Sequence, residues 1–126
     1  MFTFDTFEPG TLIGRREYVL DSGALADWLR LFPEDANGDV MPPGMMAAIT
    51  MRAYSDALKP RPPGNVHGSQ RFEIRRLPRI GSTLVTDLVC EAKELKMDRR
   101  WVHLKTVTRC AGEPAFEGRM SILWAA

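Results

Sequence analysis

One segment constrains the possible fold of this chain more than any other, the run MMAAITMRAYSDAL from Met45 to Leu58. Its first seven residues are apolar apart from Thr50, and its first charged residue is Arg52. Prolines stand just before it and just after it, at Pro42, Pro43, Pro60, Pro62 and Pro63. A helix that is apolar on every side is expected to be buried on every side. The sequence therefore predicts a central helix over 45–58 that the rest of the chain must enclose.

The residues after this helix change to the period of two that is typical of half-buried strands. We expect one strand around 71–76 and three longer ones over 83–95, 101–110 and 115–124, joined as an antiparallel meander. The side chains expected to face inward from the last two strands are Val102, Leu104, Thr106, Thr108, Cys110, Phe116, Met120, Ile122 and Trp124. One face of the sheet is therefore predicted to pack and the other to face solvent.

The first part of the chain adds a strand over 11–20 and a short helix that ends before Pro33, with Ser22 as its expected N-cap. A loop over 33–44 follows, rich in Pro, Gly, Asn and Asp. The elements predict an α+β fold in which an antiparallel sheet wraps around a long central helix, the hot-dog architecture. A single sheet of this kind leaves strand edges that a second copy can cover, so we expect a dimer.

Composition narrows the function classes. The chain has 126 residues and 14.2 kDa, which predicts one domain over 1–126. Its net charge of +1 gives no reason to expect the basic face that nucleic-acid binding requires, so no nucleic-acid partner is predicted. The charge is uneven, because residues 1–51 carry three basic and eight acidic side chains and residues 52–126 carry fourteen and eight.

Further features concern compartment and cofactors. Two cysteines, Cys90 and Cys110, make no disulfide framework, and the N-terminus does not resemble a signal peptide, so we expect a cytoplasmic protein. The most apolar segment, 41–51, is about half of the ~20 residues needed to cross a bilayer. The two histidines and two cysteines lack metal-ligand spacing, and no phosphate-binding glycine loop is present, so neither a metal nor a cofactor is predicted.

Several short motifs carry a family resemblance over about residues 10–125. They are Arg76-Leu77-Pro78-Arg79-Ile80-Gly81, Gly112-Glu113, Glu117-Gly118-Arg119 and Met41-Pro42-Pro43-Gly44-Met45. Together they resemble the MaoC-like hot-dog dehydratases and hydratases. The resemblance implies an acyl-thioester substrate, such as an acyl-CoA, and a hydration or dehydration reaction.

The loop before the helix departs from the pattern of the hydratases. Their motif has the form Asp-x-Asn-Pro-x-His, and here 35–40 reads Asp-Ala-Asn-Gly-Asp-Val, with Val40 in place of the catalytic histidine. The same residues resemble the Asp-x-x-Gly-His-Val motif of 4-hydroxybenzoyl-CoA-type thioesterases, with Asp39 in place of the histidine. The catalytic Glu of acyl-carrier-protein dehydratases would fall near Ile49, which cannot titrate, so that subtype is disfavoured. Both loop likenesses indicate a site at this loop.

Three titratable side chains are candidates for acid-base chemistry. Asp35 and Asp39 could form a carboxylate pair whose burial raises one pKa toward neutrality. The alternative is that both are turn or cap residues, which Asp commonly is before a helix. His67 could replace the missing imidazole if the start of its strand borders the site, although a lone histidine in a polar turn is more often a surface residue.

Substrate contacts are expected from the start of the helix and from basic residues. The backbone N–H groups of Gly44, Met45 and Met46 could hold the thioester carbonyl at the positive end of the helix dipole. A stiff Pro-Pro-Gly helix start is the alternative. The other candidate contacts are Asn37, which the loop motif retains, and Arg76 and Arg79, which could hold phosphates by bidentate hydrogen bonds. The alternative is that these arginines belong to a solvated face.

The hypothesis that follows is an acyl-CoA-binding hot-dog protein with enoyl-CoA hydratase or 3-hydroxyacyl-thioester dehydratase activity. Two alternatives stay open. Because the loop histidine is absent, the chain could be a non-catalytic subunit that pairs with a catalytic hot-dog chain. The loop motif also leaves an acyl-CoA thioesterase open.

Overall fold

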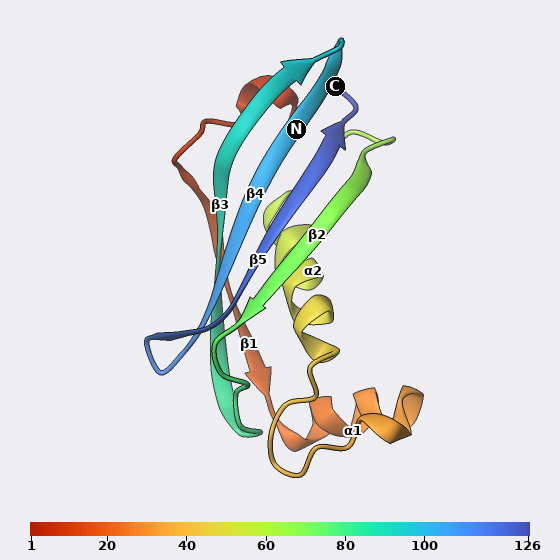
Figure 1. The fold of residues 1–126 in the computed structure, drawn as a ribbon, viewed down its shortest axis with the longest axis vertical. Helices are drawn as coiled ribbons and strands as arrows, with labels where there is room; N and C mark the ends of the chain where they lie inside the picture. The colour runs from red at the N-terminus through yellow and green to blue at the C-terminus, as the bar shows by residue number, and fades with distance from the viewer.

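The sheet has five antiparallel strands in the order β1-β3-β4-β5-β2, and the computed structural model describes residues 1–126 (Figure 1). The strands are β1 (Leu12–Leu20), β2 (Val66–Ile74), β3 (Ser82–Lys96), β4 (Arg99–Cys110) and β5 (Glu113–Trp124). The helices are α1 (Ser22–Leu31) and α2 (Met45–Ala57), with single 3-10 turns at Phe4–Thr6 and Pro33–Asp35. Neither helix is long and apolar enough to cross a membrane. The α+β class and the meander of the last three strands are confirmed.

The alternation of side chains along β4 and β5 explains how the sheet forms a core. Val102, Leu104, Thr106 and Thr108 are buried, while the residues between them are partly exposed. The β3–β4 hairpin turns through Met97 and Asp98, both with positive φ, which matches the twist of the flanking strands. The inward face expected from the period of two is therefore the packed face.

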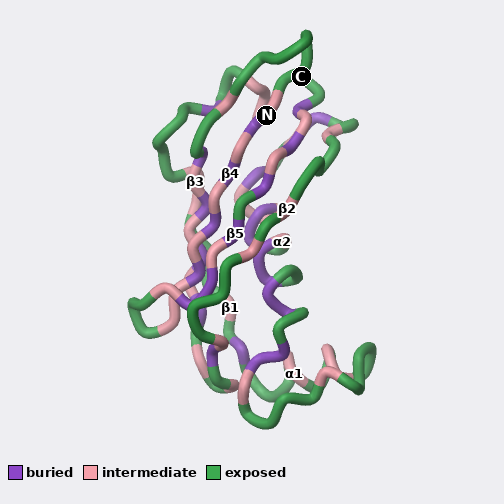
Figure 2. The backbone as a smooth tube through the Cα atoms, in the orientation of Figure 1, coloured by how far each residue is buried: buried purple, intermediate pink, exposed green.

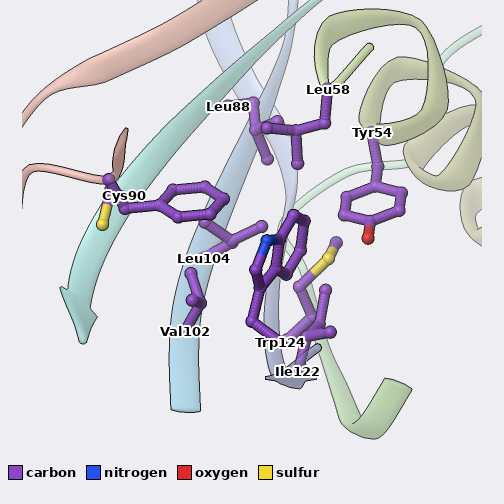
Figure 3. Close-up of a cluster of buried hydrophobic side chains, with 10 residues drawn as sticks. Tyr54, Leu58, Leu88, Cys90, Val102, Leu104, Ile122 and Trp124 are labelled. Carbon is purple, nitrogen blue, oxygen red and sulfur yellow. The ribbon is translucent and has the colours of Figure 1, made fainter. Parts of the chain in front are cut away.

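Helix α2 lies against this inner face and joins two apolar clusters. Met45, Met46 and Ile49 pack with Leu84 and Phe116 near its start. Figure 3 shows the second cluster, where Tyr54 and Leu58 face side chains of β3, β4 and β5. The alternating buried stretches of the sheet and the buried side of α2 face each other in Figure 2.

The prediction that α2 is buried on every side is wrong. Ala47, Ala48 and Arg52 are exposed, so one strip of the helix faces away from the sheet. The physical reason is that one sheet covers only one side of a helix, and a pocket separates much of α2 from α1. The exposed strip contains small apolar residues that one copy of the chain does not cover.

Two other details differ from expectation. The N-cap of α1 is Asp21, whose Oδ1 accepts the N–H of Ala24 at 2.8 Å, while Ser22 is already helical. The first ten residues, for which no element was predicted, close one end of the inner face. Phe7 is buried edge-to-face against Trp124 with ring centroids 4.8 Å apart, and the indole Nε1 of Trp124 donates to the carbonyl of Phe2 at 2.7 Å.

On the outer face, Asp87 of β3 ties three strands together. Its carboxylate accepts from Arg15 Nε of β1 at 2.6 Å and from Arg109 Nη1 of β4 at 3.0 Å. Its side chain is only 13% exposed. The hydrogen bond from Arg15 and the charges of both arginines outweigh desolvation and hold the pKa of Asp87 below its ordinary value of 3.8.

This carboxylate predicts a pH-dependent contribution to stability. Because the folded-state pKa is depressed, the stabilisation is present above pH 3.8 and is lost as the pH falls through the folded-state value. Replacing Asp87→Asn is expected to cost about 1 kcal/mol at pH 7. The measurement is urea unfolding of both proteins from pH 7 to pH 3. A difference between them that persists unchanged at pH 3 would contradict this account.

Candidate functional site

A pocket of about 700 Å³ lies between α1, β1 and α2. Its apolar wall includes Tyr18, Trp28, Met45 and Ile49. Four carboxylates also line it, with Arg52 as the only basic side chain: Glu17, Asp21, Asp27 and Asp56. The pocket has the size of a small-molecule site and an acidic rim.

Beside this pocket, Trp28 brings the loop carboxylate to the start of α2. The indole Nε1 of Trp28 donates to Asp35 Oδ2 at 2.9 Å in a partly buried position. Gly44 makes the close packing possible, because a Cβ there would lie 2.9 Å from Trp28 Cζ2 and 3.5 Å from the same Asp35 oxygen. Trp28 is itself packed on Phe32, with ring centroids 4.6 Å apart. Three elements thus meet at one point: α1, the 3-10 turn and the N-terminus of α2.

The helix start provides fewer free donors than expected. The N–H groups of Met45 and Met46 donate to the carbonyls of Pro42 and Pro43, each at 3.1 Å, so both are occupied. Their side chains are buried in the core. The N–H of Gly44 has no hydrogen-bond acceptor. Gly44 itself packs beside the Asp35 carboxylate, whose Oδ2 would lie 3.5 Å from a Cβ on this residue. Of the three expected donors, only Gly44 is available to a ligand.

Asp39 has a different set of neighbours from Asp35. Its carboxylate forms an ion pair with Arg79 Nη1 at 2.8 Å, and both side chains are about three-quarters exposed. Its carbonyl accepts the N–H of Ile80 at 2.7 Å, so the loop is tied to the turn before β3. Asn37 is exposed beside it, and its carbonyl accepts the Val40 N–H at 3.2 Å. No hydrogen bond joins the two aspartates, and the expected carboxylate pair is not formed.

His67 and Arg76 lie apart from this cluster. His67 is the second residue of β2 and pairs with the buried Ile122, which places it on the inner face. Strand β2 begins at the end of the sheet opposite to α1 (Figure 1), so one chain does not bring His67 to Asp35. Arg76 is exposed and lies 3.3 Å from Glu113.

Sequence reasoning missed the two aromatic residues that shape the pocket. Trp28 recurs with Leu25, Leu29 and Phe32 at helical spacing, which predicts a helix but gives Trp28 no role in a site. Its role in holding Asp35 depends on a contact that the spacing does not reveal. Tyr18 has its pKa raised, mainly by burial, although Arg52 above its ring at 5.8 Å acts in the opposite direction.

The cluster has a definite chemical capacity. Asp35 is a carboxylate with one indole donor, so its other lone pairs can accept from a water or a ligand. Gly44 presents a backbone donor at the positive end of the α2 dipole, where an anionic oxygen is favoured. A ligand oxygen that accepts from Gly44 N–H and a water or ligand group that donates to Asp35 could therefore bind side by side.

Comparisons with known proteins relate this arrangement to a fold. No protein-family model and no curated protein sequence matches the chain. Among solved structures, the MaoC-like dehydratase from Rhodospirillum rubrum aligns with a TM-score of 0.83 at 16% identity, covering 100% of this chain and 99% of that one. The HadBC (3R)-hydroxyacyl-ACP dehydratase complex from Mycobacterium tuberculosis aligns at 0.72 and 14%, covering 91% and 96%.

A thioesterase from Thermus thermophilus, solved with coenzyme A and zinc, aligns with a TM-score of 0.69 at 10% identity and covers 93% of this chain and 82% of that one. Hot-dog proteins with different activities thus share this architecture. The resemblance to MaoC-like proteins that the sequence motifs indicated is confirmed at the level of the fold, because the chain has the hot-dog fold.

Proposed function

We propose that this chain binds an acyl thioester of the acyl-CoA class at the start of α2 and supports its hydration or dehydration. The observation that carries the proposal is the Asp35 carboxylate, which Trp28 holds beside Gly44, a residue whose N–H has no acceptor. The hot-dog fold shared with dehydratases adds support.

The geometry suggests a role for each group. The thioester carbonyl would accept from Gly44 N–H, which polarises the enoyl group and stabilises negative charge on the oxygen. Asp35 would take a proton from water as the water oxygen bonds to C3, and the protonated Asp35 would then return this proton to C2, so that one water is added across the double bond. The apolar wall formed by Tyr18, Met45 and Ile49 would hold the acyl chain.

The charges suggest where the CoA phosphates would lie. The four carboxylates around the α1–α2 pocket would repel them. Arg76 and Arg79 lie in the segment between β2 and β3, and Arg79 is joined to the loop through Asp39. We therefore assign the acyl end to the pocket and the phosphate end to the arginine side.

A dimer through β2 would complete the site. β2 is an edge strand, and its Val66 and Ile74 are about half exposed. In an antiparallel pairing of two β2 strands, the His67 end of one strand lies beside the Ile74 end of the other. That arrangement would bring the partner's His67 toward the loop that contains Asp35, whereas His67 of the same chain lies far from this loop.

One observation favours a second candidate function, a non-catalytic subunit of a heteromeric hydratase. Val40 occupies the place of the motif histidine, and within one chain no imidazole lies beside Asp35. A chain of this kind would hold the acyl group while another hot-dog chain supplied the catalytic dyad.

A crotonyl-CoA hydration assay tests the chemistry. Hydration is monitored by the loss of enoyl absorbance, and free thiol is measured in the same samples. Wild-type protein is expected to hydrate without releasing thiol. Asp35→Asn is expected to lower kcat at least a hundredfold because it removes the base. The matched control is Asp98→Asn in the β3–β4 turn, an exposed carboxylate outside the site, which should keep wild-type activity.

Other outcomes separate the alternatives. Binding of crotonyl-CoA without turnover, with activity appearing only after a dyad-bearing hot-dog chain is added, would replace the hydratase with the accessory subunit. Release of thiol would identify a thioesterase. Absence of affinity for acyl-CoA of any chain length would overturn the thioester proposal as a whole.

Sedimentation equilibrium tests the dimer. The expected mass is twice the 14.2 kDa of one chain. Ile74→Lys places a charge on the β2 edge and should shift the protein toward monomer, whereas Leu12→Lys on the other edge strand, β1, should leave the mass unchanged. A monomeric wild-type protein, or equal effects of the two variants, would exclude pairing through β2.

A further inference from the structure

A second groove, of about 630 Å³, lies on the outer face of the sheet at the end that carries the β3–β4 hairpin. Trp101 and His103 alternate with the buried Val102 and Leu104, so both project away from α2. α1 lies at the opposite end of the sheet (Figure 1). The groove is therefore separate from the Asp35 cluster.

The two aromatic rings of the groove lie parallel to each other. The rings of Trp101 and His103 are parallel within 2°, with centroids 6.4 Å apart. Trp101 extends from β4 over the bulge in β2, where a Cβ on Gly68 would lie 2.9 Å from its Cζ3. Gly68 thus lets the indole lie against the sheet.

His103 is held from both sides. Its Nδ1 lies 2.8 Å from Ser121 Oγ of β5, and its Nε2 lies 3.1 Å from Glu94 Oε1 of β3. The single carboxylate that lines the groove, Glu94, is therefore already engaged by a hydrogen bond. The imidazole is fixed in place parallel to the indole.

Two positive side chains of the groove differ from most of the others on this face. Arg109, Arg119 and Lys105 each lie within 4 Å of a carboxylate. Lys96 and Arg99, at the hairpin end of the groove, form neither an ion pair nor a side-chain hydrogen bond. Two positive side chains without carboxylate partners, Lys96 and Arg99, therefore line the same groove as the Trp101 ring.

We propose that this groove binds a planar aromatic anion of the nucleotide class. The base stacks on Trp101, parallel to both rings, as bases do on aromatic side chains. Lys96 and Arg99 contact the phosphates through charge-assisted hydrogen bonds. The hydroxyl of Ser69, which also lines the groove, is a further polar contact.

Titration calorimetry with ADP as the probe tests the groove. Wild-type protein is expected to bind ADP more tightly than either adenosine or inorganic phosphate. Adenosine can contact only the aromatic part of the groove, and inorganic phosphate can contact only its two positive side chains. Trp101→Leu should weaken ADP binding about tenfold or more through lost stacking. Lys96→Gln combined with Arg99→Gln should weaken ADP binding and leave adenosine binding unchanged.

Two controls keep the test specific. Arg71→Gln removes an exposed, unpaired cation of β2 outside the groove and should leave ADP affinity unchanged. Asp35→Asn should also leave it unchanged, even if the thioester proposal fails. Far-UV circular dichroism and thermal unfolding verify that the variants fold. Lack of ADP binding by wild-type protein, equal affinity for inorganic phosphate, or an equal loss in Arg71→Gln would overturn the proposal.

Discussion

The burial of one side of α2 against one sheet is the interaction on which the rest of the structure depends. Two apolar clusters form between the helix and the sheet, with alternating side chains of β3, β4 and β5 on the sheet side. The helix side is formed by Met45, Met46, Ile49, Tyr54 and Leu58. Each buried side chain of this size contributes about 1.5–3 kcal/mol. Because the sheet curves around only one side, the opposite side of the helix remains open to a second layer.

The position of the candidate site follows from how α2 begins. Pro42 and Pro43 direct their carbonyls to the N–H groups of Met45 and Met46, so the first turn is closed by its own backbone. Gly44 remains the single open donor and the single place without a side chain, and Trp28 fills that space. The indole N–H then holds Asp35 in place. A short sequence at one helix end therefore determines the local electrostatics of the site.

The outer face is organised by charge. Asp87, Glu91 and Glu117 each pair with arginine or lysine side chains of other strands, and the pair between Glu91 and Arg119 spans β4. This face is therefore held by cross-strand ion pairs. The hairpin end departs from this rule. There a carboxylate is bound by an imidazole, and two cations have no partner.

The sequence by itself determined the elements and the packed face. The run of apolar residues identified α2, and the period of two residues identified the meander and its inward side chains, such as Leu104 and Phe116. Both follow from local spacing, which dictates which residues share a face. The loop motif also indicated Asp35. Tertiary structure alone decided which residues meet: Trp28 with Asp35, Phe7 with Trp124, and Asp39 with Arg79 rather than with Asp35. These contacts join segments whose separation in the chain carries no local pattern, so only the packing of helix on sheet could determine them.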